Sequence, residues 1–200
     1  MNQPLTREQA QKVFEAIASR GDKIAFRWLR EGCECRAQLM IERLQAMGLE
    51  PGRAWVVAVG RRPSFPHPTQ PKQSYYWENH VAPTVTVEGV GRGVLVIDPS
   101  ISPTGPLTLT EWAGKLRVKS FEVSDVGLSQ TEILSRQTER GLRGEDLDAL
   151  VFNLRLGEAP IPERGGTGFC IGPDPTEGIS TFAHEEMRKF LARQRKLPPG

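Results

Sequence analysis

Three residues of this 200-residue chain have the chemical types needed for cysteine-based hydrolysis of an amide: Cys33, His80 and Asp98. This chemistry needs a thiolate nucleophile, an imidazole that takes up and returns a proton near neutral pH, and a carboxylate that orients the imidazole. The sequence pattern places the three residues on different secondary-structure elements, as triad chemistry allows. We therefore expect an active site where the fold brings these elements together.

Cys33 is predicted to begin a helix that runs to about Met47. Gly32 lets the backbone turn tightly before this helix, and the free N–H groups at a helix start favour the thiolate form of a cysteine. Cys33 lies one turn before Ala37 on the apolar stripe, so its sulfur should point inward. Cys35 lies about 200° further round, on a different face. The alternative interpretation of either cysteine is a small buried hydrophobic residue.

His80 falls within a predicted strand, Tyr75–Glu88, that we expect to be interrupted near Pro83. Alternate residues of a strand share a face, and His80 is predicted to lie opposite the apolar set of Trp77, Val81, Val85 and Val87. An imidazole in this position can act as the base for a thiol. The alternative is a strand histidine that only hydrogen-bonds to a neighbour. The other two histidines, His67 and His184, have the surroundings of surface residues.

Asp98 directly follows a short apolar strand, Gly93–Ile97, and precedes Pro99, which cannot continue a hydrogen-bond ladder. A carboxylate at the end of a buried strand needs a hydrogen-bond partner. An imidazole would provide this hydrogen bond, and the carboxylate would in turn fix the tautomer of the imidazole. The alternative is ordinary turn chemistry, because Asp-Pro-Ser is common in turns.

The remaining pattern predicts an α+β fold in which the helix of the nucleophile packs on a mainly antiparallel sheet. Further helices are expected at 6–19 with Thr6 as N-cap, at 109–116 capped by Thr108 or Thr110, at 130–140, at 145–153 and at 180–195. Further strands are expected at 54–60 and, weakly, at 118–123, and the apolar alternation of 23–29 also has strand spacing. The proline- and glycine-rich segments 61–73 and 157–178 are predicted to be loops. We expect one domain over residues 1–200.

Charge and hydropathy exclude several classes of protein. Twenty-six basic and 24 acidic residues leave a formal net charge of +2 without a basic block, so nucleic-acid binding is not expected. No run reaches the roughly 18 apolar residues that a membrane span needs, and Met1–Arg20 is a polar amphipathic stretch rather than a signal peptide. We expect a cytoplasmic protein, or an effector that is delivered without a signal peptide.

The three cysteines, Cys33, Cys35 and Cys170, form no even disulfide framework, and a bridge between the first two would be strained. A reducing compartment fits this cysteine usage best. The cysteines and histidines show no spacing typical of a tetrahedral zinc site, so neither a metal nor another cofactor is expected.

Four motifs resemble the bacterial protein-glutaminases, which are protein-glutamine deamidases related to the transglutaminase and papain-like fold. The motifs are EGCECRAQLMIERLQAMG, WENHVAP, VLVIDPSI and PLTLTEW, in this order, within residues 25–115. The resemblance implies that Cys33, His80 and Asp98 form a catalytic triad and that the substrate is a glutamine side chain of a protein or peptide. It also implies a thioester at Cys33, which water deprotonated by His80 hydrolyses. Residues 25–115 would be the catalytic core, and 116–200 an extension of unknown role.

Three other functions fit the same residues. A transglutaminase-type acyltransferase would let a lysine amine resolve the thioester, and a papain-like peptidase or isopeptidase would cleave a chain. A non-catalytic binding module would keep the fold and lose the reaction. Ammonia release without cross-links favours deamidation, new N-termini favour proteolysis, and an unreactive Cys33 favours the binding module.

Overall fold

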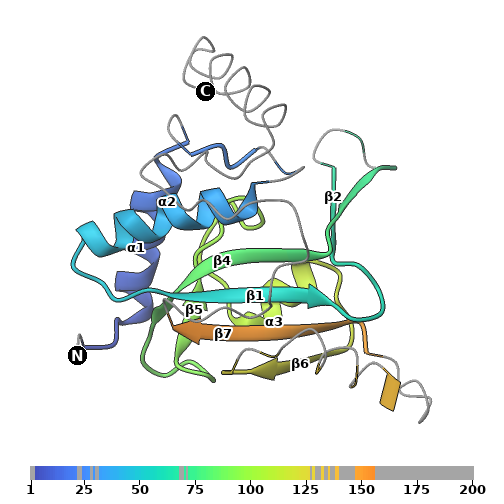
Figure 1. Cartoon of the computed structure of the whole chain (residues 1–200). Coiled ribbons are helices and arrows are strands. Elements are labelled where there is room, and N and C mark those ends of the chain that lie inside the picture. The colour runs from blue at the N-terminus through green and yellow to red at the C-terminus, as the bar shows by residue number, and fades with distance from the viewer. Residues whose placement is uncertain are drawn as a thin grey trace.

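A computed structural model describes residues 3–126 of the chain except 22, 23, 28, 30, 31, 68, 69 and 71, together with residues 147–155 and positions 128, 132, 135, 138 and 139. Its helices are α1 (Arg7–Ala18), α2 (Cys33–Ala46) and α3 (Leu109–Lys115). Its strands are β1 (Gly52–Ala58), β2 (Ser64–Pro66), β3 (Ser74–Tyr76), β4 (Asn79–Thr86), β5 (Val94–Val96), β6 (Phe121–Ser124) and β7 (Ala149–Arg155). Figure 1 shows these elements in their chain order.

Five strands form one sheet in the order β5-β4-β1-β7-β6, and β2 pairs with β3 in a separate two-stranded sheet. Neighbours in the large sheet are antiparallel except for β6 and β7, which are parallel. The central strand β1 therefore has one neighbour from early in the chain and one from beyond residue 147. The predicted α+β class with a mainly antiparallel sheet is confirmed.

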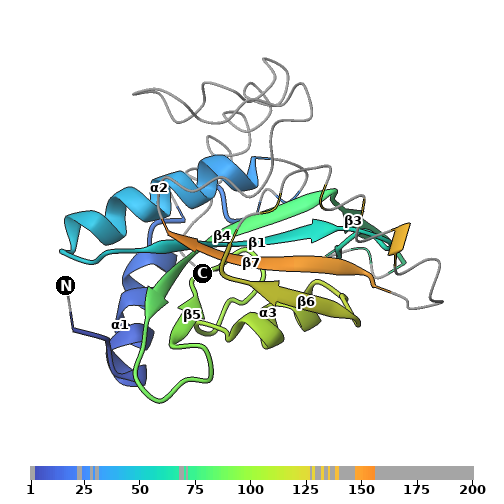
Figure 2. The same cartoon turned by 60° about the horizontal axis from the view of Figure 1, so that its bottom comes forward.

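Helices cover both faces of the large sheet, as Figure 2 shows for α2 on one face and α3 on the other. On the α2 face, Cys33 and Ala37 pack in one cluster with Trp55, Val57 and other apolar strand residues. On the α3 face, Trp112 and its neighbours pack with Ala54, Val56 and Ala82. Helix α1 joins α2 over the β4–β5 end of the sheet. Because both faces are covered, β1 is a continuous apolar run rather than an alternating one.

Most expected elements are present within a few residues of their predicted bounds. Thr6 and Thr108 are the N-caps of α1 and α3, and each forms a capping box with the residue three positions on, Gln9 or Glu111. Helix α2 begins at Cys33 as predicted, and β1, β5 and β6 correspond to the strands predicted at 54–60, 93–97 and 118–123.

The strand predicted at 75–88 is interrupted, but the predicted position of the break at Pro83 is wrong. The break falls after Tyr76, and β4 then runs from Asn79 through Pro83 to Thr86. The carbonyl of Pro83 accepts a hydrogen bond from Ile97, just past the end of β5. The missing N–H of the proline points to this same edge of β4, so the pairing of β4 with β1 is unaffected.

The helix predicted at 145–153 is wrong, because Ala149–Arg155 forms strand β7. Its sequence ALVFNLR contains β-branched and aromatic residues, and its position between β1 and β6 buries both of its faces. The predicted loop 61–73 contains β2, which pairs with β3. The described residues of segment 23–29 form no strand.

Several predictions lie outside the described residues: the loop at 157–178, the helix at 180–195, and His184 within that helix. Of the helix predicted at 130–140, the described positions 132, 135, 138 and 139 are helical. Among the helices that the structure describes, none has the length and apolar character required to span a membrane.

Candidate active site

The edge of β4 that faces β5 is paired over only part of its length. Strand β5 pairs with β4 at Thr84–Thr86, and the N–H of Ile97 then donates to the carbonyl of Pro83 at 2.9 Å. Peptide groups of alternate residues point to the same edge of a strand, so the N–H of Val81 points to this edge beyond the end of β5. It donates a hydrogen bond to the thiol of Cys33. The start of α2 therefore lies against β4 next to His80.

The start of α2 has no side-chain cap. Its N-cap is Gly32, which has φ 75°, a left-handed conformation that other residues adopt only with strain. Since glycine has no side chain, the first-turn N–H groups of α2 are not used by an N-cap residue. Cys33 is 5% exposed and packs with Ala37 and Val81, which confirms the predicted helix start and inward direction of this cysteine.

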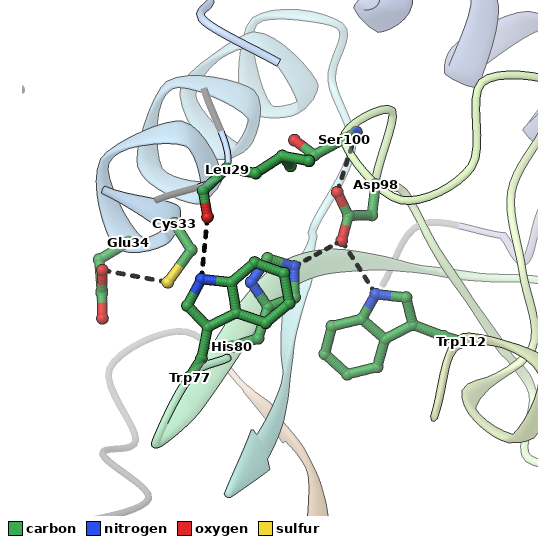
Figure 3. A network of polar contacts seen from close by, with 8 residues as sticks. All are labelled: Leu29, Cys33, Glu34, Trp77, His80, Asp98, Ser100 and Trp112. Atoms are coloured by element: carbon green, nitrogen blue, oxygen red, sulfur yellow. Dashed lines mark hydrogen bonds and ion pairs between the residues drawn. The ribbon is translucent and has the colours of Figure 1, made fainter. Parts of the chain in front are cut away.

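His80 and Asp98 form a buried pair, shown in Figure 3. Nε2 of His80 lies 2.8 Å from Oδ2 of Asp98, and the two side chains are 1% and 3% exposed. The carboxylate also accepts the indole N–H of Trp112 at 2.9 Å and the backbone N–H of Ser100 at 3.1 Å. Burial acts to raise the pKa of Asp98, but the charge and hydrogen bond of His80, the bond from Trp112 and the charge of Arg36 outweigh it. The pKa of Asp98 is therefore lowered, and the group is held as a carboxylate.

The imidazole of His80 lies between two tryptophans. The ring of Trp77 is stacked on it with centroids 5.1 Å apart, and the ring of Trp112 is tilted at 5.6 Å. Trp77 in turn donates its indole N–H to the carbonyl of Leu29 at 2.9 Å. Nδ1 of His80 is buried and makes no hydrogen bond within the part of the chain that the structure describes. Figure 3 shows this nitrogen on the side of the ring where Cys33 lies.

The predicted faces of the strand that contains His80 are partly wrong. Trp77, which was predicted to lie opposite His80, stacks on its ring and packs in the core around Trp112. His80 does alternate with Val81, which faces α2, but the opposite face of β4 is not polar. Ala82 on that face belongs to the core around Trp112. Since α3 covers this second face, the imidazole is removed from solvent rather than exposed to it.

Burial and the charges around the thiol together shift its pKa. The pKa of Cys33 is raised well above its ordinary value, first by burial and then by the carboxylate of Glu34, which accepts a hydrogen bond from Sγ at 3.2 Å. The charge of Arg36 and the N–H of Val81 act in the opposite direction. The helix start alone was expected to favour the thiolate, but burial and Glu34 reverse that effect in the resting site.

Three residues near Cys33, His80 and Asp98 have no chemical role predicted from the sequence: Glu34, Arg36 and Trp112. Arg36 is buried, and burial lowers the pKa of its guanidinium against the charges of Cys33, Asp98 and Glu34. Each of the three lies within a motif that marked the site, since Glu34 and Arg36 closely follow Cys33 and Trp112 ends PLTLTEW. The contact of Trp112 with Asp98 depends on the packing of α3 against the end of β5, which the motif does not encode.

Cys35 takes part in a disulfide, whereas Cys33 is free. The partner of Cys35 therefore lies outside the described residues. The prediction of a reducing compartment rested on the cysteine usage, and the disulfide of Cys35 removes that support, since disulfides persist in oxidising compartments.

His67, expected at the surface, is half-buried, and its ring stacks on that of Tyr75 with centroids 5.1 Å apart. It lies with the small sheet of β2 and β3 rather than with the triad residues. Among the described residues, no three His, Cys, Asp or Glu side chains are arranged to hold a metal ion.

A comparison with models of protein families places the chain in one of them. A family model described as glutaminase matches residues 10–116, which is more than half of the chain. No curated protein matches the chain.

The solved structures similar to the chain include a crystal structure of pro-protein-glutaminase, with 23% identity and a TM-score of 0.47 over 58% of this chain and 44% of that one. They also include the NMR structure of protein-glutaminase from Chryseobacterium proteolyticum, with 22% identity and a TM-score of 0.47 over 56% of this chain and 63% of that one. A crystal structure of protein-glutaminase has 24% identity and a TM-score of 0.44 over 52% and 59% of the two chains. The chain thus spans less than two thirds of the length of each.

Proposed function

Because the chain belongs to the glutaminase family, whose model matches more than half of it, we propose that it deamidates glutamine side chains of proteins or peptides through a Cys33-His80-Asp98 triad. The observation that carries the proposal is the buried pair of His80 and Asp98 beside the thiol of Cys33. His80 has one nitrogen bound to Asp98, and the next residue, Val81, bonds to the thiol. A nucleophile, a base and an orienting acid are thus within one continuous set of contacts.

In the first half of the proposed reaction, the thiol proton of Cys33 passes to Nδ1 of His80. The sulfur then attacks the carbon of the glutamine carboxamide, and the π electrons of the C=O bond move onto oxygen. First-turn N–H groups of α2, which no N-cap side chain occupies, would hold this oxyanion. The C–N bond then breaks, the nitrogen takes the proton from His80, and ammonia leaves a thioester on Cys33.

In the second half, water gives a proton to His80 and its oxygen attacks the thioester carbon. The C–S bond breaks, the sulfur regains a proton, and glutamate is released. Because Asp98 accepts a hydrogen bond from Nε2 of His80, Nε2 keeps its hydrogen throughout the reaction. Nδ1 is then the nitrogen that takes up and returns the proton in both halves. Trp112 supports this arrangement through its hydrogen bond to the same oxygen of Asp98. Every step uses side chains of this chain and water, without a cofactor.

The test is incubation of a glutamine-rich protein with the full chain and with Cys33→Ser. We expect ammonia release by the wild type, conversion of glutamine to glutamate on mass spectrometry of the substrate, and neither with Cys33→Ser. Circular dichroism of both proteins controls for folding. If the substrate instead incorporated an added amine and no glutamate formed, the result would indicate the acyltransferase.

New N-termini in the substrate would indicate the peptidase. A wild type that produces none of these changes, on several glutamine-containing substrates, would leave the non-catalytic binding module and overturn the proposal.

A further inference from the structure

Glu34 directly follows Cys33, the proposed nucleophile, in the first turn of α2. Its carboxylate is half-buried, and Oε2 accepts the hydrogen bond from Sγ of Cys33 at 3.2 Å. A negative charge at this distance opposes formation of a thiolate. In the resting site, Glu34 therefore holds Cys33 in the thiol form that cannot attack an amide.

The thiol has one proton and two groups that could accept it. Nε2 of His80 is bonded to Asp98, and Nδ1 is buried without a hydrogen bond in the described structure. The thiol hydrogen bond nevertheless goes to Glu34, and in Figure 3 this bond leads away from His80. Nδ1 of His80 is thus free of other hydrogen bonds in the described structure, while the thiol proton that it must receive is bonded to Glu34.

A primary carboxamide carries the donors that could displace the thiol from Glu34. When the amide carbon lies within bonding distance of Sγ, the amide nitrogen is one bond further on and within reach of a carboxylate 3.2 Å from the same sulfur. An amide N–H is a stronger donor to a carboxylate than an S–H group. The carboxylate of a glutamate product has no such donor, and its charge would be repelled.

We propose that Glu34 restrains the Cys33 thiol and also accepts the NH₂ group of the glutamine carboxamide, so that arrival of the substrate amide frees the thiol proton for His80. The inference rests on the proposed deamidation and names how the same site selects and responds to its substrate. Once the amide occupies Glu34, the proton moves from Sγ to Nδ1, and the steps of acylation follow without any added reagent. The departing nitrogen leaves beside a negative charge that favours its cationic form.

A simpler role for Glu34 is that of an acidic residue in the first turn of a helix, where it interacts with the helix dipole. That role predicts a small effect on stability and no effect on the chemistry of Cys33. The two roles therefore differ in what happens to the reactivity of the thiol.

The test compares Glu34→Gln with the wild type in two assays. The first measures the rate at which Cys33 reacts with iodoacetamide between neutral and alkaline pH, in the unreduced protein. The second measures kcat/KM for deamidation of a peptide with blocked ends and one glutamine. We expect Glu34→Gln to alkylate about tenfold faster at neutral pH and to deamidate about tenfold more slowly, since a charge-assisted hydrogen bond is lost from each state.

Glu42→Gln is the matched control, because Glu42 is an exposed acidic residue of the same helix and accepts a hydrogen bond from Gln38. It should leave both rates at the wild-type level. Glu34→Asp, which keeps the charge, should restore slow alkylation.

Wild-type values for both rates of Glu34→Gln, or a fall in both together, would overturn the inference, because restraint and substrate binding require opposite changes. If the wild type itself released no ammonia, the proposed function would fail, and unchanged or slower alkylation of Glu34→Gln would show separately that Glu34 does not restrain the thiol.

Discussion

Helices α1 and α3 begin differently from α2, although all three pack against strands of the same large sheet. Thr6 and Thr108 cap α1 and α3, and each accepts a hydrogen bond from the backbone three residues on. Helix α2 instead begins with Gly32 in a left-handed conformation and Cys33 directly after it. A side-chain cap stabilises a helix by occupying its first N–H groups. The start of α2 lacks that side-chain stabilisation, and no N-cap side chain stands between its first turn and the thiol.

The largest expected effect comes from the group that orients the base facing this uncapped start. Asp98→Asn keeps the size of the side chain but removes the charge that fixes His80. We expect kcat/KM for deamidation to fall by about 10⁴-fold, as in triads whose orienting aspartate becomes an amide. Steady-state ammonia release measures it, and circular dichroism controls for folding. A decrease in kcat/KM of less than tenfold would show that deamidation at the start of α2 does not need a base oriented by Asp98.

The same substitution should change the response of stability to acid. The folded-state pKa of Asp98 lies below its ordinary value of 3.8. The stability that Asp98 contributes is therefore present above this ordinary value and is lost as the pH falls through the lower folded-state pKa. Urea unfolding at a series of acidic pH values should show a smaller acid-dependent loss for Asp98→Asn than for the wild type. If the free energy of unfolding fell equally steeply with decreasing pH in the two proteins, the assigned pairing of His80 with Asp98 would be contradicted.

Trp112→Phe tests the second donor to Asp98 and should have a smaller effect. Removal of the indole N–H takes one hydrogen bond from a buried carboxylate, which is worth about 1.5–3 kcal/mol. We expect kcat/KM to fall at least tenfold, with the aromatic contact to His80 largely kept. Trp55→Phe is a suitable control, because Trp55 is also buried but lies on the α2 face of the sheet. Its activity should stay near the wild-type level.

Gly32→Ala tests the start of α2 directly, and Gly48→Ala is its matched control at the other end. Both glycines have positive φ, 75° and 79°. Each substitution should therefore reduce the free energy of unfolding by about 1–2 kcal/mol. Only Gly32→Ala moves the residue next to the nucleophile, so it alone should lower kcat/KM, by roughly tenfold. Equal activities of the two variants would show that the backbone at Gly32 has no role beyond folding.

The smallest effects are expected at the capped helices. Thr6→Ala and Thr108→Ala each remove a capping hydroxyl and should each reduce the free energy of unfolding by about 1 kcal/mol. Neither hydroxyl contacts the triad, so kcat/KM should not change. Chemical denaturation and ammonia release measure the two quantities on the same samples. If Thr6→Ala lowered kcat/KM, the caps of α1 and α3 would affect function as well as stability, and the contrast with the uncapped α2 would fail.

The start of α2 was predictable from the sequence because its determinants are local. A glycine, a cysteine and an apolar stripe at helical spacing define the helix bounds and the direction of the thiol within about one turn. The same holds for the two capping boxes and for Asp98 at the end of β5. Each of these features depends on residues only a few positions apart, which the linear pattern contains.

Strand β7 and the surroundings of His80 depended on contacts that the sequence does not display. The segment that forms β7 also fits a helix, and only pairing with β1, about a hundred residues earlier in the chain, selects the strand. Likewise, the position of Trp112 against Asp98 follows from the packing of α3 on the second face of the sheet.

The sequence by itself therefore determined the choice of Cys33, His80 and Asp98 as the proposed catalytic residues, through residue types and spacings that local backbone geometry makes meaningful. Tertiary structure decided the state of those residues. The burial of the His80–Asp98 pair, the bond from Trp112 and the burial of Cys33 against the strands all depend on the packing of α2 and α3 on opposite faces of the sheet. Desolvation and charge contacts fix protonation, and both arise only when distant segments pack together.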